Sequence, residues 1–233
     1  EGRLAIQTAA VLEPQRALFR SYLGKAYSAE HLNELALRDL DRAKSLDPND
    51  PTAWLYSSLV KKEQNQINEA VSDLQNSQRL NDNRGLFRSR NLLDQDQAIR
   101  AANLASIYRD AGMTDLSRRE ASRAVDYDIT SPSAHLFLAN SYDTLRDPKQ
   151  INLRYETPWA SELFLANLLA PVGAAPLSQN ISQHEYSRLF ERSGFGLSSN
   201  TEYTSNGDWQ QTASQYGTFD DFSYSIDVDY RSE

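Results

Sequence analysis

Histidines are the residues of this 233-residue chain best suited to bind a metal or to transfer a proton, and there are three of them. His31, His135 and His184 lie far apart in the sequence, and their spacing is not of the kind that metal ligands show. His184-Glu185 is not followed by the second histidine of a zinc-protease helix. The chain contains no cysteine, which excludes thiol nucleophiles, iron–sulfur clusters and cysteine-based zinc sites. The sequence therefore predicts no metal and no cofactor.

The acidic and glycine-containing segments give no catalytic pattern either. Asp94 and Asp96 are two residues apart, as are Asp126/Asp128 and Asp227/Asp229, so each pair diverges on a helix or shares one solvated strand face. The run 47–51 is predicted to be a turn, because it lacks the spaced ligands and the terminal glutamate of a calcium loop. The segment 194–196 lacks the third glycine of a phosphate-binding loop. We therefore predict that the protein is not an enzyme.

Charge and aromatic content divide the chain into two regions. The formal net charge is −8 and the pI is about 5.0, which argues against a nucleic acid partner because phosphates require a concentrated basic surface. Residues 151–233 contain only 4 of the 24 Lys and Arg residues, but 11 of the 32 acidic residues and 13 of the aromatic ones. No apolar run approaches the ~18 residues of a membrane-spanning helix, and no signal peptide opens the chain. The two regions are therefore predicted to differ in their type of structure.

A 34-residue repeat organises the first region. Three similar tripeptides recur at that spacing, namely Leu12-Glu13-Pro14, Leu46-Asp47-Pro48 and Leu80-Asn81-Asp82. The same offset aligns small and apolar residues in pairs, Ala36 with Ala70, Leu40 with Leu74 and Ala43 with Ser77. Upstream of these positions the first complete unit has Leu23, Gly24 and Tyr27, and the next unit opens with Trp54.

This pattern resembles the tetratricopeptide repeat (TPR), in which small residues let two antiparallel helices approach and larger apolar residues fill the gaps between neighbouring pairs. A third unit continues it with Leu104-Ala105, Tyr108, Gly112, Ser117, Ala121 and Ala124, and a fourth begins with Leu138-Ala139 and Tyr142 before it breaks at Asp147-Pro148. The resemblance implies a mainly α protein, an α-solenoid of helix pairs over residues 1–147. Residues 2–13 match only a second helix, so we expect the chain to be a fragment of a longer repeat array.

The repeat lengthens between the second and third units, from 34 to 47 residues, so about 13 extra residues lie between Asn81 and Gln97. This span contains the basic and apolar run Arg84-Gly85-Leu86-Phe87-Arg88-Ser89-Arg90. Two interpretations stay open: a loop that faces a ligand, or an elongated helix end whose arginines are solvated.

The helical period fades after Pro148, and residues 148–193 are predicted to be a connector. Within it, Tyr155 to Trp159 is expected to be extended, because Pro158 disfavours a helical Thr157. Residues 160–170 are densely apolar and predict a short helix, either buried against the last repeat or lying on a membrane surface. One more short helix is predicted at 183–192.

Residues 194–233 change to a period of two. Phe222, Tyr224, Ile226, Val228 and Tyr230 alternate with polar residues, and Asn206-Gly207-Asp208 is a strong turn signal. The pattern predicts a short antiparallel β meander with strands at about 195–205, 209–219 and 222–231. Such strands resemble those of an outer-membrane β-barrel, although a soluble sheet packed on a helix gives nearly the same pattern. Three strands cannot close a barrel, so they would be the first strands of a truncated one.

In TPR proteins the first helix of each pair lines a concave groove. The resemblance therefore implies a set of groove residues, which are Lys25, Ala29, Leu59, Lys62, Ser106, Arg109, Asn140 and Asp143. Their mixed polarity suits an extended peptide, a helix or a polar glycan chain. The carboxylate clamp of chaperone-binding TPR proteins requires paired Lys and Asn residues in adjacent units. Here Lys25 is followed by Leu59, so the clamp is not reproduced. The alternative is that these residues are merely solvated helix faces. His135 holds the repeat position of Trp54, so we expect it to be packed and not to bind a metal.

The order of a TPR region followed by β strands resembles bacterial exporters of exopolysaccharide, in which a periplasmic TPR scaffold precedes an outer-membrane pore. We therefore expect a non-catalytic, protein-binding scaffold of a bacterial cell envelope, periplasmic or in the outer membrane through the C-terminal strands of a longer chain, with a role in assembly or export. The alternative is a soluble TPR adaptor, for instance cytoplasmic, with a small docked sheet. An enzyme with its active site outside this chain is a third hypothesis.

Overall fold

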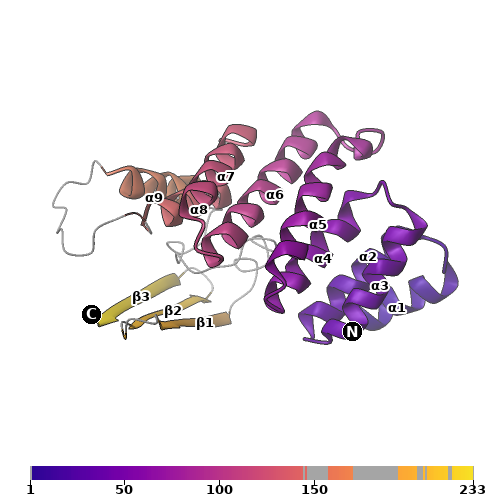
Figure 1. Ribbon diagram of the computed structural model, residues 1–233, viewed down its shortest axis with the longest axis horizontal. Helices are drawn as coiled ribbons and strands as arrows, with labels where there is room; N and C mark the ends of the chain where they lie inside the picture. Colours follow the sequence, from indigo (N-terminus) through magenta and orange to yellow (C-terminus); the bar gives the residue numbers. More distant parts are fainter. Residues whose placement is uncertain are drawn as a thin grey trace. The chain divides into compact units, whose positions relative to one another are not determined.

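The computed structural model describes residues 2–143, 145, 157–169, 194–203, 207, 209–219 and 222–232 (Figure 1). The chain forms two compact units, Glu1–Tyr127 and Asp128–Glu233. The described part of the first unit is helical, with α1 (Gly2–Leu12), α2 (Ala17–Ala29), α3 (Asn33–Leu46), α4 (Pro51–Glu63), α5 (Ile67–Arg79), the 3-10 turn η1 (Asn81–Arg84), α6 (Arg90–Asp110) and α7 (Thr114–Tyr127). The described part of the second unit contains α8 (Pro132–Asp143), α9 (Pro158–Leu169), β1 (Gly194–Tyr203), β2 (Trp209–Phe219) and β3 (Phe222–Ser232).

The first unit is built from helix pairs. In it α2 packs against α3, α4 against α5 and α6 against α7, and each pair also contacts the next one. This arrangement confirms the predicted mainly α, TPR-like solenoid. Gly24 marks a close approach within the first pair, because a Cβ atom there would lie 2.5 Å from Cγ of Leu40. Leu40, Leu74 and Ile107 are fully buried in the layers between pairs.

Local sequence signals set where the helices begin. Asp50 caps α4, since its Oδ1 accepts hydrogen bonds from the Thr52 amide at 2.9 Å and the Thr52 hydroxyl at 2.6 Å. Pro51 then occupies the first helical position, where its missing N–H costs nothing. In the second unit, the Thr157 hydroxyl accepts a hydrogen bond from the Ala160 amide at 3.2 Å. The extended connector predicted at 155–159 is therefore wrong at its end. Pro158 starts α9, because the first helical position needs no N–H donor and the fixed φ of proline suits a helix.

The turns inside the three helix pairs share one backbone feature. His31, Asn65 and Gly112 stand at equivalent repeat positions, and their φ angles are +58°, +59° and +74°. Each turn carries the same two hydrogen bonds; in the first, the amide of His31 donates to Ser28 O at 2.8 Å and that of Leu32 to Tyr27 O at 2.9 Å. His31 is thus a turn residue with a left-handed backbone.

A left-handed conformation at a histidine costs about 1 kcal/mol relative to glycine. We therefore expect His31→Gly to raise the free energy of unfolding by about 0.5–1 kcal/mol, measured by urea denaturation. The matched control is Gln64→Gly, one residue before the second turn, where φ is −86° and glycine brings only its entropic cost. A gain in the control, or a loss for His31→Gly, would show that backbone strain is not what these turns have in common.

The extra residues between the second and third repeats form a turn and additional helix. α6 has 21 residues against 13 in α2 and in α4, and the added helix lies at its N-terminal end. Arg88 pairs with Asp96, and Arg90 lies 3.1 Å from Asp94. Leu86 and Phe87 remain 85% and 84% exposed. The span thus combines an elongated helix, as one interpretation expected, with a protruding apolar pair.

In the second unit, α9 packs on α8 through Ala160 and Ala166, while Phe164 and Leu168 stay exposed. The described strands pair antiparallel in the order β1-β2-β3, with Leu197 opposite Gln215 and Gln215 opposite Ile226. The short helix predicted at 183–192 lies outside the described residues.

Candidate binding surface

The first helices of the first two repeats lie beside each other, because α2 contacts α4 directly. Within the described residues, the backbones of the second helices α3 and α5 do not approach each other as closely, and the ion pair of Lys44 with Asp73 spans between them. We call α2 and α4 the inner helices and α3 and α5 the outer helices. When the first helices of neighbouring repeats approach more closely than the second helices, the array curves and the first helices lie on its concave face.

Four side chains form a patch on the inner helices. Tyr22 and Lys25 lie three residues apart on α2, and Tyr56 and Leu59 hold the equivalent positions on α4. The rings of Tyr22 and Tyr56 have centroids 6.1 Å apart, and the Lys25 ammonium lies 5.1 Å from the Tyr56 ring centroid. Tyr22 is exposed, while the other three side chains are half-buried. We call these four residues the α2/α4 patch; it offers apolar area and one cation to a partner.

The groove changes character at α6. Lys62 Nζ lies 2.8 Å from the Ser106 hydroxyl and 2.9 Å from Asp110, and Arg109 lies 3.3 Å from Asp110. Ser106 is buried, so it is not available on an open surface. The structure therefore brings three of the predicted groove residues together as a polar bridge between α4 and α6, joined by an aspartate that the sequence analysis missed.

The remaining predicted residues are separate from this cluster. Ala29 is exposed at the end of α2. Asn140 is buried in α8 and Asp143 is half-buried at its end, and both belong to the second unit. The two tyrosines of the patch were also missed, although a signal existed: each precedes a predicted groove residue by three positions and so lies on the same helix face.

A buried acidic residue recurs on the second helix of each pair. Asp39, Asp73 and Glu120 are separated by 34 and 47 residues, the same offsets as the repeat itself, and all three are buried. Asp39 accepts a hydrogen bond from Arg20 at 2.8 Å, and Glu120 one from Arg123 at 2.5 Å. The repeat spacing was the signal that could have revealed this set.

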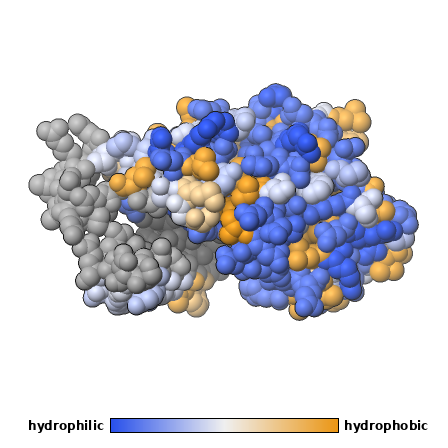
Figure 2. Space-filling model, in the orientation of Figure 1, coloured by the Kyte–Doolittle hydropathy of each residue, from blue (hydrophilic) through white to orange (hydrophobic). Residues whose placement is uncertain are grey.

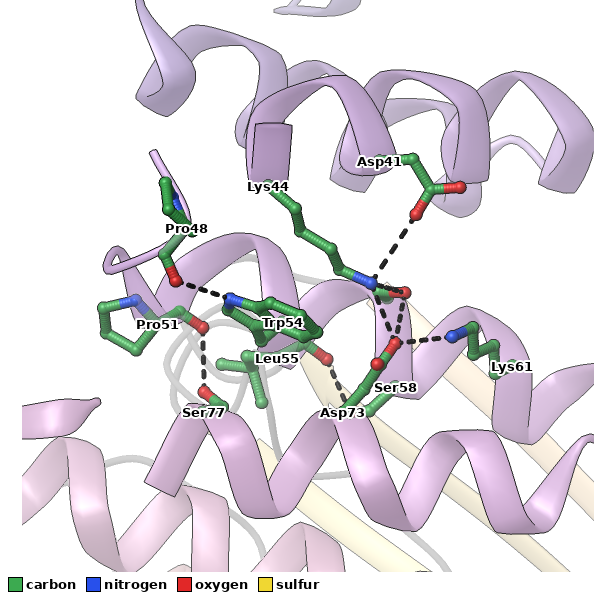
Figure 3. Close-up of polar contacts among 11 residues, drawn as sticks. Asp41, Lys44, Pro48, Pro51, Trp54, Leu55, Ser58, Lys61, Asp73 and Ser77 are labelled. Atoms are coloured by element: carbon green, nitrogen blue, oxygen red, sulfur yellow. Dashed lines mark hydrogen bonds and ion pairs between the residues drawn. The ribbon is translucent and has the colours of Figure 1, made fainter. Parts of the chain in front are cut away.

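Asp73 holds the most extensive of these contacts (Figure 3). Its Oδ2 accepts hydrogen bonds from the Ser57 hydroxyl at 2.6 Å, from Lys61 at 2.8 Å and from Lys44 at 2.9 Å, so the carboxylate ties α3, α4 and α5 together. Lys44 also lies 4.6 Å from the Trp54 ring centroid. Burial raises the pKa of Asp73, but the hydrogen bonds from Lys61, Ser57 and Lys44 outweigh it, so the pKa is lowered overall.

A second buried contact joins the end of α5 to α6. The Arg100 guanidinium, almost fully buried, donates to the Ser77 hydroxyl at 2.8 Å and to the Asn81 side-chain oxygen at 2.5 Å. Both of these acceptors are uncharged, and the charge of nearby Asp96 favours the charged form of Arg100. Burial lowers the pKa of Arg100 to about 10, which still leaves the group charged at neutral pH.

His135 contributes to packing in the second unit, as its repeat position predicts. Its ring is buried in α8, with Nδ1 2.6 Å from a carboxylate oxygen of Glu162 on α9 and Nε2 2.9 Å from the carbonyl oxygen of Ile129. Among the described residues, no group of three or more His, Asp or Glu side chains is placed to hold a metal ion. Nor is any described helix both long and apolar enough to cross a membrane.

The face of the first unit that Figure 2 shows is mostly hydrophilic, with apolar side chains between the hydrophilic ones. The feature that distinguishes the α2/α4 patch is the contact among its aromatic rings and its lysine. The contacts of Asp39 and Asp73 join neighbouring helices of the first two repeats, whereas the contact of Glu120 with Arg123 lies within α7.

No family model matches this sequence, and no curated protein matches it. Solved structures do resemble it. The structure of the "APC/C hetero-tetramer Cut9-Hcn1" has a TM-score of 0.58 at 20% identity over 72% of this chain, but the match spans only 29% of the other chain. PilF of Pseudomonas aeruginosa has a TM-score of 0.54 at 15% identity, covering 72% of this chain and 71% of its own. A MamA protein has a TM-score of 0.50 at 17% identity, covering 72% and 80%. These are TPR proteins, and the likeness shows the fold of this chain as TPR-like.

Proposed function

We propose that this chain is a non-catalytic adaptor that binds a protein or peptide partner through the α2/α4 patch. The observation that carries the proposal is the pairing of Tyr22 with Tyr56 beside Lys25 on two helices that contact each other directly. Aromatic side chains on a preorganised scaffold bring large contact area at a small cost in conformational entropy. A peptide can bury side chains on Tyr22 and Leu59, which favours it over a polar glycan chain.

The experiment is a selection of displayed peptides on the full chain, followed by affinity measurements with variants. Tyr22→Ala is expected to weaken the selected peptides by about tenfold or more, the usual loss for an aromatic hot spot. Leu32→Ala is the matched control: this leucine is exposed to a similar degree, 41% against 37%, but lies in the turn between α2 and α3. Equal losses in both variants, or none in either, would contradict binding through the α2/α4 patch.

We further propose that the strands place the protein at the outer membrane of a bacterial envelope. On the sheet face whose side chains are described no residue is charged, and Phe195, Leu197, Phe222 and Ile226 are more than half exposed. Aromatic rings gather at both ends of this face: Trp209 lies 5.0 Å from Tyr230 at one end, and Tyr224 lies 6.3 Å from Phe222 at the other. The middle of the face combines aliphatic with uncharged polar side chains, among them Ser199, Thr201, Gln211 and Gln215. Aromatic residues at both ends of an uncharged strand face are typical of strands that face lipid. At the outer membrane, we propose that the protein acts in assembly or export.

Lipid contact is testable with the full chain carrying Trp54→Phe and Trp159→Phe, so that Trp209 is the remaining tryptophan. Brominated lipids in nanodiscs are expected to quench its fluorescence, and Ile226→Asp on the same sheet face is expected to abolish the quenching. Quenching that persists in that variant would mean that the face does not contact lipid. No quenching at all would favour an adaptor without membrane contact.

A further inference from the structure

We infer that the partner segment bound by the α2/α4 patch is acidic and carries aromatic or large aliphatic side chains between its carboxylates. This inference rests on the proposed function. It comes from how charge is distributed between the inner and outer helices.

The inner helices are positive in a chain whose net charge is −8. α2 contains Arg20 and Lys25 and no acidic residue, and α4 contains Lys61, Lys62 and one acidic residue, Glu63, so together they carry a formal charge of +3. The outer helices α3 and α5 contain four basic and five acidic residues, a formal charge of −1. The sign therefore reverses between the two sides of the first two repeats.

Two ion pairs that join an inner to an outer helix point the same way, while the cations Arg38 and Lys44 pair within or between the outer helices. Arg20 on an inner helix bonds Asp39 on an outer one, and its side chain is 24% exposed against 5% for the aspartate. Lys61 bonds Asp73 in the same orientation, with 19% exposure against 7%. Each pair thus has its cation on the inner helix and its buried carboxylate on the outer helix. Because the Debye length at physiological salt is about 8 Å, a partner on the inner side experiences the nearer, positive ends.

Two lysines are placed to meet carboxylates at this surface. Lys25 lies within the patch, and Lys62 lies at its edge, where it shares Asp110 with Arg109. The bridge from Lys62 to Asp110 is a partly exposed pair, with side chains 28% and 39% exposed, so its strength is low and a partner carboxylate can compete for the lysine. The tyrosine rings and Leu59 lie between these cations and require apolar groups at the intervening positions of the partner.

The test uses fluorescent synthetic peptides with the full chain. One peptide carries glutamates and phenylalanines, a second replaces each glutamate by lysine, and a third replaces each phenylalanine by glycine. The first is expected to bind at least about tenfold more tightly than either of the others, and its affinity is expected to fall as salt rises. Tight binding of the glycine peptide would show that charge alone suffices and would overturn the requirement for apolar side chains.

Charge-reversal variants locate the contact. Lys25→Glu is expected to weaken the acidic peptide by about tenfold, because it sets like charges against each other. Arg38→Glu makes the same charge change on outer helix α3, where the side chain is 68% exposed, and is expected to change the affinity less than about twofold. Equal effects of the two variants would show that only the net charge of the chain matters and would overturn the inference.

The displayed-peptide selection separates this inference from the proposed function. If the selected peptides are sensitive to Tyr22→Ala but are not enriched in Asp and Glu, the inference fails and the proposed function stands. If the affinity of no selected peptide depends on Tyr22, both the inference and the proposed function fail. A single-stranded oligonucleotide is the third probe, since aromatic and basic residues also bind nucleic acid; binding tighter than that of the acidic peptide would assign this surface to a different class of partner.

Discussion

Asp73→Ala is expected to lower the free energy of unfolding of the first unit by about 3–5 kcal/mol, the usual cost of breaking a buried ion pair. The aspartate is nearly inaccessible, and its removal leaves Lys44, Lys61 and the Ser57 hydroxyl without their shared acceptor. Two cations would then face each other in the joint of three helices, with their desolvation no longer offset. Urea denaturation followed by circular dichroism measures the change.

The matched control is Asp41→Ala. Asp41 lies 3.6 Å from the same Lys44 ammonium, but its side chain is 68% exposed, and exposed ion pairs contribute only about 0–1 kcal/mol. A loss in the control as large as that of Asp73→Ala would mean that burial is not what gives the Asp73 contact its strength.

The same carboxylate predicts how stability depends on pH. Because the pKa of Asp73 in the folded protein is lowered from its ordinary value of 3.8, its contribution is fully present above pH 3.8 and is lost as the pH falls through the lowered value. The difference in stability between the parent protein and Asp73→Ala should therefore be constant near neutrality and shrink in acid. A difference that grows in acid would contradict this assignment of the charged form.

Arg100→Ala is expected to cost about 2–4 kcal/mol, because it creates a cavity and removes the donors to Ser77 and Asn81 in a buried joint. Arg100→Met keeps most of the volume of the side chain but removes the buried charge. Its loss in free energy of unfolding is therefore expected to be smaller than that of Arg100→Ala by at least about 1 kcal/mol. The burial of the guanidinium is the reason for this difference, because burial disfavours a charged group and lowers its pKa. Thermal denaturation of the two variants measures the difference in their stability. An equal loss in both would mean that Arg100 stabilises the joint through its hydrogen bonds alone.

The sequence predicted the helix pairs through the 34-residue offset, which carries the small residues that bring helices together. Asp50 and Pro51 were assigned only to the turn 47–51, although a capping aspartate followed by a proline is also a signal for the start of a helix. The end of the connector was misplaced because Pro158 was considered for its effect on Thr157, while its preference for a first helical position prevails once Thr157 caps the helix.

The candidate site was less accessible to sequence reasoning because it depends on contacts between repeats. Lys62 and Ser106 were both predicted as groove residues, but only the structure shows that they bond each other and that Ser106 is buried. The charges of Lys44 and Lys61 gave no hint that both meet one buried carboxylate, since these residues lie on different helices and 12 to 29 positions from it. The repeat offset linking Asp39 to Asp73 was present in the sequence, and a search for recurring polar residues would have found it.

Amide hydrogen exchange of the full chain, with and without a peptide selected on it, tests the central claim most directly. If the chain is an adaptor that binds through the α2/α4 patch, the peptide should slow exchange in α2 and α4 and leave α3 and α5 unchanged, and Tyr22→Ala should remove that protection. Protection confined to α3 and α5, or to the second unit, would contradict the account.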